Sequence, residues 1–253
     1  MSSSAAPERG FSLLEVMVAL VVVALLAAAL ALPVAAQLQM RRADEARRSL
    51  DEARDALLAF AALHGRLPCP ATLSTHGQEA FADGGAPANG RCADFHGGLL
   101  PAAALGMAPL DDAGFLRDPW QSAGNRVRYA VHGGPVNAVA HALTRTHGMR
   151  QATLPALGEA PHYLFVCVSG ESAGPTGCGP AANQLTRRAA FVLLATGPNG
   201  VSAPEGASDE ARNLDGDASF VSREPGVGGF DDIVHWASIH MLIHRMLVAG
   251  RLP

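Results

Sequence analysis

The chain has 253 residues, of which 49% are hydrophobic and 17% charged, and its formal net charge is −4. This balance, with a pI of about 6.2, argues against a basic surface for nucleic acid or for anionic lipid headgroups. About 200 residues follow the N-terminal apolar stretch, enough for one domain with its own hydrophobic core.

An apolar run extends from Phe11 to Ala36 and contains one charged residue, Glu15. As a helix it would be about 39 Å long, which is enough to span a bilayer. A charged side chain in the middle of a membrane helix costs about 2.5–3.5 kcal/mol on insertion scales, so it usually marks a function and has a partner. The simplest partner is a new α-amino group on a neighbouring copy, made by cutting the chain after Gly10.

The stretch RGFSLLEVMVAL at residues 9–20 resembles the cleavage and methylation signal of type IV prepilins and type II secretion pseudopilins. The resemblance implies that residues 1–10 are a cytoplasmic leader peptide. A prepilin peptidase would cut between Gly10 and Phe11 and methylate the new amine of Phe11. Glu15 would then pair with the terminal ammonium of an adjacent subunit during assembly. An ordinary signal anchor is the alternative.

After cleavage the apolar run, residues 11–36, stays on the mature protein. We therefore expect a single-pass protein of the bacterial inner membrane, with its C-terminal head in the periplasm until the subunit enters a filament. The arginines alone favour the opposite orientation, because one precedes the span and four follow it closely: Arg9, then Arg41, Arg42, Arg47 and Arg48. The leader, which must be cytoplasmic to be cleaved, and the downstream cysteines favour a periplasmic head.

Helical periodicity continues beyond the apolar run to His64. Apolar residues recur at helical spacing, at Leu50, Ala53, Leu57 and Ala61. Gly65 predicts the end of the helix, so residues 37–64 should be its amphipathic continuation and residues 65–253 a globular head. Two i,i+4 ion pairs are expected on the exposed face: Arg47 with Asp51, and Arg48 with Glu52.

The head shows three strand candidates, Val127–His132, Tyr163–Ser169 and Ala190–Thr196. A polar, acidic loop is predicted from Ala203 to Gly229, and apolar spacing predicts a C-terminal helix over Ile233–Leu247. The expected fold class is α+β, with a long N-terminal helix packed on a small antiparallel sheet and with long loops. Segments such as FDDIVHWAS resemble pseudopilin-type heads, so the expected fold is pilin-like.

Four cysteines follow the apolar run: Cys69, Cys92, Cys167 and Cys178. An even number in an extracytoplasmic domain favours two disulfides, and four cysteines allow three connectivities. Proximity in the sequence favours Cys69 with Cys92 and Cys167 with Cys178. A zinc site of four thiolates would need paired, closely spaced cysteines, which the sequence lacks.

The oxygen-bearing side chains of the acidic loop and of the residues just after it suit calcium: Asp209, Glu210, Asn213, Asp215 and Asp217, followed by Asp231 and Asp232. Asp209, Asp215 and Asp217 are the candidate ligands. The major pseudopilins that the chain resembles bind calcium in a C-terminal loop, so calcium is a candidate cofactor here. The alternative is a solvated acidic loop, with Asp231 or Asp232 capping the last helix. His240 and His244 are spaced for one helix face, but no third metal ligand is evident, and they are interpreted as polar-face residues.

No catalytic motif stands out, so we expect a structural subunit and not an enzyme. The leading hypothesis is a type II secretion pseudopilus subunit, or one from a related type IV filament. Its expected partners are a prepilin peptidase, other pilin or pseudopilin subunits, an inner-membrane assembly platform and the lipid bilayer, with no nucleic acid. The alternatives are a minor adhesive or DNA-uptake pilin and, in another class, a membrane-anchored periplasmic enzyme or metal-binding protein.

Overall fold

The computed structural model describes residues 12–120, 125–200, 208–224 and 229–253, without the side chains of residues 27–36 and 208. Contacts divide the chain into two units, one ending at Arg42 and the other beginning at Ala43. Both units contain part of α1 (Leu13–His64), the longest helix described. The elements form an α+β fold, which confirms the predicted class.

The part of α1 in the second unit buries the face that the sequence predicted. Its apolar residues are fully buried at Leu50, Ala53, Leu57 and Ala61. The helix ends at His64, and Gly65 follows with a φ of 72°. Glycine adopts this left-handed conformation without steric cost, which allows its N–H to bond to the carbonyl of Ala61 at 2.8 Å and terminate the helix.

The strand β3 (Gln184–Ala195) lies at the centre of a five-stranded sheet. It pairs antiparallel with three strands, β1 (Arg128–Val131), β2 (Leu164–Cys167) and β5 (Ile233–Ser238). The last strand, β4 (Ser219–Val221), runs parallel to β2. The sheet is therefore mixed, and the prediction of a purely antiparallel sheet was wrong for this one pair.

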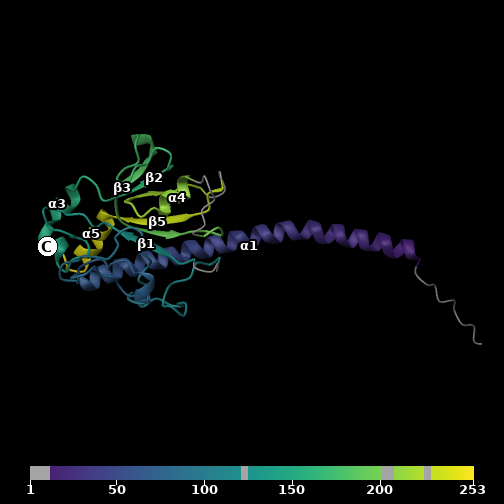
Figure 1. Ribbon diagram of the computed structural model, residues 1–253, viewed down its shortest axis with the longest axis horizontal. Helices are drawn as coiled ribbons and strands as arrows, with labels where there is room; N and C mark the ends of the chain where they lie inside the picture. Colours follow the sequence, from purple (N-terminus) through teal and green to yellow (C-terminus); the bar gives the residue numbers. More distant parts are fainter. Residues whose placement is uncertain (1–11, 121–124, 201–207, 225–228) are drawn as a thin grey trace, which may run out of the picture. The chain divides into compact units, whose positions relative to one another are not determined.

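Alternate residues of β3 enter two different hydrophobic clusters, as expected for a strand with both faces covered. Phe191 and Leu193 join the cluster that contains the buried face of α1. Val192 and Leu194 face the other way and join a cluster with Leu214 of α4 (Ser208–Leu214). Figure 1 accordingly shows α4 on the side of the sheet away from the second half of α1.

The predicted helix over Ile233–Leu247 is wrong in its first part. Residues 233–238 form β5, and the helix α5 begins only at Ile239 and ends at Val248. The β-branched and aromatic residues of β5 favour a strand, and pairing with β3 decides the outcome. Ser238 accepts a hydrogen bond from the N–H of Met241 at 3.3 Å and so starts the helix.

Several short elements were not predicted from the sequence. They are the helices α2 (Gly148–Ala152) and α3 (Leu154–Glu159), and the 3₁₀ turns η1 (Leu73–Thr75) and η2 (Ala181–Asn183). The segment predicted as an acidic loop contains α4 and β4. That segment is therefore part of the sheet and its cover, and this determines where its acidic side chains point.

Candidate assembly site

Glu15 lies in the first turn of α1, and its side chain is exposed. Its backbone N–H donates to the carbonyl of Ser12 at 3.0 Å, which places it at the start of the helical hydrogen-bond ladder. The N-terminal end of a helix carries a partial positive charge, so a carboxylate in this position is electrostatically favoured. A Glu15 carboxylate that faces outward here is available to a group from another molecule.

Apolar side chains surround Glu15 on the helix surface. Glu15, Val16, Ala19, Leu20 and Val23 line one groove with a volume of about 350 Å³. The large apolar residues of this turn region are strongly exposed, with Leu13 at 78% and Leu14 at 70%. An apolar surface of this extent marks a contact with lipid or with another protein.

Gly10 and Phe11, the predicted cleavage and methylation site, lie outside the described residues. Among the residues that are described, no helix reaches the combination of length and hydropathy that marks a membrane span.

The four cysteines form two disulfides, and the pairing is the one that sequence proximity favoured. Cys69 is joined to Cys92 across 23 residues, and Cys167 to Cys178 across 11 residues. Near the first bridge, Glu79 accepts the N–H of Cys69 at 2.8 Å and forms an ion pair with Arg66 at 2.6 Å. The bridge therefore helps to hold the chain directly after α1.

The three acids predicted as calcium ligands are not brought together. Asp209 lies 2.7 Å from Arg223 and accepts the N–H of Gly170. Asp215 and Asp217 each lie 2.8 Å from Arg212. In this arrangement the three carboxylates act as partners of two arginines.

A different group of carboxylates converges where α4 meets the start of β5. Glu210, Asp231 and Asp232 each have an oxygen within 4.8 Å of the others, the only such group of His, Cys, Asp or Glu found among the described residues. The adjacent Asp231 and Asp232 were visible in the sequence, but Glu210 is distant in sequence and is placed by α4. No periodicity in the sequence could have paired them.

Burial makes this cluster electrostatically costly. Burial, with the nearby charges of Glu210 and Asp231, raises the pKa of Asp232 to about 7. Burial, Glu210 and the fully buried Asp118 raise the pKa of Asp231 to about 6. Three carboxylates in a small space favour either a bound proton or a cation.

The cluster is otherwise well ordered by hydrogen bonds. Asn199 donates to Glu210 at 2.8 Å, and the N–H of Asp231 donates to Glu210 at 2.9 Å. Asn213 donates to Asp232 at 2.8 Å. One oxygen of Asp231, Oδ1, is buried and accepts no hydrogen bond among the described residues, so it has the capacity to bind another ligand.

Gly197, in the turn after β3, must lack a side chain because the backbone there lies directly against this cluster. Gly197 has a φ of 62°, and a Cβ there would collide with Oδ1 of Asp231. Glycine is therefore the residue that fits at this position. It lets the backbone pass directly against the carboxylates.

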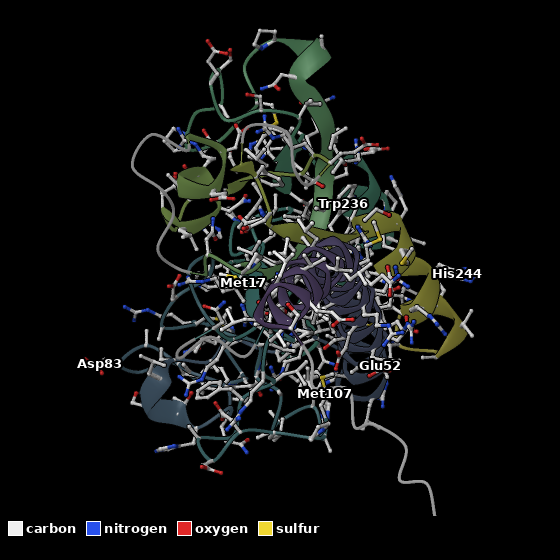
Figure 2. All side chains as sticks on the ribbon, turned by 90° about the vertical axis from the view of Figure 1, so that its right-hand side faces the viewer. Met17, Glu52, Asp83, Met107, Trp236 and His244 are labelled. Atoms are coloured by element: carbon white, nitrogen blue, oxygen red, sulfur yellow. A yellow bond between two sulfur atoms is a disulfide. The ribbon has the colours of Figure 1, made fainter. Side chains whose placement is uncertain are left out.

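The histidines of α5 lie apart from this cluster. His240 and His244 are both exposed, and Figure 2 shows His244 at the outer side of α5. His235 on β5 instead lies 3.2 Å from Asp51 of α1. These positions agree with the interpretation of His240 and His244 as polar-face residues.

Comparison with known protein families finds one match, to a motif at the start of the chain. Residues 6–31 match the prokaryotic N-terminal methylation motif, the signature of type IV prepilins and pseudopilins. This confirms the predicted motif and implies a structural subunit that a peptidase processes and that assembles with other pilin-like subunits. No curated protein and no solved structure matches the chain.

Proposed function

We propose that the chain is a structural subunit of a type II secretion pseudopilus or of a related type IV filament. The observation that carries this proposal is the methylation motif at residues 6–31, with Glu15 exposed in the first turn of α1. Cleavage between Gly10 and Phe11 would place a new ammonium just before that turn. The same segment would then provide both partners of a contact between neighbouring copies.

In this mechanism Glu15 of an incoming subunit pairs with the Phe11 ammonium of the preceding subunit, which is already in the filament. The surrounding apolar groove would exclude water from the pair, which strengthens the attraction but requires desolvation of both charges. The net gain in stability is therefore small, and the pair mainly selects the register. Burial of exposed side chains such as Leu13, Leu14 and Leu20 provides most of the association energy.

Before assembly the same apolar surface would hold the subunit in the inner membrane with its head in the periplasm. The support for this location is the apolar run of residues 11–36 and the two disulfides of the head, which suit an oxidising compartment. A prepilin peptidase, an assembly platform in the membrane and other subunits would be its partners.

Replacing Glu15 by Gln tests the proposal directly, because the substitution removes the charge but little volume. We expect normal cleavage of the leader, since Glu15 is not one of the two residues at the cut, and at least a tenfold loss of filament incorporation. Leader removal is measured by mass spectrometry and assembly by shearing and sedimentation of filaments.

The matched control is Glu159→Gln, at the C-terminal end of α3 in the head, which should assemble like the wild type. If Glu15→Gln enters filaments as efficiently as this control, the proposed role of the carboxylate is wrong.

We also propose that Glu210, Asp231 and Asp232 hold a divalent cation, with calcium as the favoured ion. The fit rests on the short separation of their oxygens and on the buried Oδ1 of Asp231, which accepts no hydrogen bond among the described residues. Carboxylate oxygens are the ligands that calcium prefers. A bound cation would neutralise the repulsion within the cluster and tie α4 to β5.

A further inference from the structure

The disulfide between Cys167 and Cys178 closes a loop that lies against α4. Residues 168–177 within it include three glycines and a proline, and glycines give an unconstrained chain many conformations. The two joined cysteines are buried in a small apolar cluster that includes Ala173. The bridge therefore restrains a segment that is flexible by its own sequence. This segment, residues 167–178, is named the bridged loop.

The bridged loop holds α4 on both sides of Glu210. The N–H of Gly170 donates to the carboxylate of Asp209, the residue directly before Glu210. Arg212, two residues after Glu210, donates to the carbonyl of Ala173 at 2.9 Å. Because these contacts lie on either side of Glu210, the loop determines where that carboxylate lies.

The bridged loop also holds β4, the strand that follows α4. The N–H of Gly177 donates to the hydroxyl of Ser219 at 3.1 Å, and the N–H of Ser222 donates to the carbonyl of Cys167 at 2.9 Å. The strand β4 also pairs in parallel with β2, which leads into the loop. Figure 1 shows α4 beside β2 accordingly. The loop therefore contacts α4 and β4 together.

α4 and β4 support one side of the cluster of Glu210, Asp231 and Asp232. Glu210 lies on α4, and Asn213 of the same helix donates to Asp232 at 2.8 Å. Asn213 also accepts the N–H of Val221 in β4 at 2.7 Å. The two aspartates directly precede β5, which pairs with β3. The separation between Glu210 and the two aspartates therefore depends on where the bridged loop holds α4.

We propose that the bridge between Cys167 and Cys178 positions Glu210 for cation binding, through the contacts of Asp209 and Arg212 with the bridged loop. The inference rests on the cation site proposed above. When the bridge is absent, the loop no longer presents its N–H and carbonyl groups in fixed places, and α4 gains mobility. Groups that hold a metal ligand in place commonly change metal affinity by about 10–100-fold.

The other disulfide provides a matched control. No hydrogen bond joins residues 69–92 to α4 or β4 in the part of the chain that the structure describes. The bridge between Cys69 and Cys92 closes a loop of 23 residues, against 11 for the bridge between Cys167 and Cys178. Its loss should therefore cost at least as much stability without moving Glu210. The pair of variants separates a loss of stability from a loss of the cation site.

Calcium titration calorimetry of the full chain in detergent at pH 8 tests the proposal. Cys167→Ser with Cys178→Ser should bind calcium at least about tenfold more weakly than the wild type. Cys69→Ser with Cys92→Ser should bind calcium like the wild type. Wild-type affinity in the first variant, or an equal loss in both, would overturn the positioning role.

Arginine variants test the same contact with both bridges intact. Arg212→Gln removes the donor to Ala173 and should weaken calcium binding severalfold. The control is Arg188→Gln, because Arg188 also donates to a backbone carbonyl, that of Gly158 at 2.7 Å, but lies outside the bridged loop. Equal calcium affinities of these two variants would contradict the proposed link.

Hydrogen exchange gives a readout that needs no cation. In the presence of chelator, the backbone amides of α4 should exchange severalfold faster in Cys167→Ser with Cys178→Ser than in the wild type. In Cys69→Ser with Cys92→Ser they should exchange as in the wild type. Unchanged exchange of α4 in the first variant would show that the bridge does not hold this helix.

The outcomes separate this inference from the proposed cation site. If the wild type binds calcium and the variant without the Cys167–Cys178 bridge binds it equally well, only the positioning role is wrong. If the wild type binds no calcium, the cation site and the positioning role both fail.

Discussion

At the scale of single residues, the adjacent Asp231 and Asp232 show how burial and neighbouring negative charge raise the pKa of a carboxyl group. Their raised pKa values, about 6 and about 7, mean that the folded state prefers the protonated acids. The folded pKa of each acid lies above its unfolded pKa of 3.8. The contribution of the protonated acid to the free energy of unfolding is therefore fully present below pH 3.8, and it is lost as the pH rises through 6 and 7. A cation would offset this loss at neutral pH.

Asp232→Asn should therefore stabilise the full chain in detergent at pH 8 with chelator present. The amide removes the buried charge and retains an oxygen for Asn213. We expect the free energy of unfolding at pH 8 to increase by an amount on the order of 1–3 kcal/mol, which raises the Tm by about 2–4 °C for each kcal/mol. At pH 4 the increase should be near zero. Thermal melting followed by circular dichroism measures the difference.

Adding calcium tests whether the cluster binds a cation or only a proton. Millimolar calcium at pH 8 should raise the Tm of the wild type and of the control Asp215→Asn, but should raise that of Asp232→Asn much less. An equal response of all three proteins to calcium would show that the cation does not bind at Glu210, Asp231 and Asp232.

At the scale of elements, the buried face and the end of a helix could be predicted, because both depend on residues that are close in the sequence. The face of α1 through Leu50 and Leu57 and the helix end at Gly65 follow from periodicity and glycine chemistry. Both predicted i,i+4 pairs, Arg47 with Asp51 and Arg48 with Glu52, were wrong, since neither forms among the described residues. Arg47 turns back to Asp44 because Asp51 is engaged by Arg54 and His235, and His235 comes from a strand that helical spacing could not reveal.

Pairing between distant strands explains the other errors. The start of β3 at Gln184 and the strand character of residues 233–238 depend on partners far along the chain. For the same reason the convergence of Glu210, Asp231 and Asp232 was not predicted, although all three lie in or directly after the predicted acidic loop. By contrast, the methylation motif and the disulfide pairs could be predicted, because both depend on spacing within short segments.

The disulfide between Cys69 and Cys92 allows a test at this scale. Replacing both residues by Ser opens a 23-residue loop and should cost on the order of 3 kcal/mol. The Tm should fall by about 6–12 °C, as measured by calorimetry of the full chain in detergent. Replacing Cys167 and Cys178, which close a shorter loop of 11 residues, should cost somewhat less. No change in either variant would contradict the stabilising role assigned to these bridges.

At the scale of the whole molecule, the chain combines an exposed apolar helix with a disulfide-bonded head. The apolar residues around Glu15 have no cover within their own unit among the described residues, whereas the head buries its core between α1 and the sheet. A unit that cannot bury its apolar surface alone must find lipid or other copies. The proposed filament assembly through Phe11 and Glu15 would meet that requirement.

The N-terminus of the protein isolated from its native membrane tests this account most directly. Mass spectrometry should find a chain that begins at Phe11 with a methylated α-amine and that lacks residues 1–10. A mature protein that still begins at Met1, with an unmodified leader, would contradict the account, because the ammonium that Glu15 is proposed to bind would not exist.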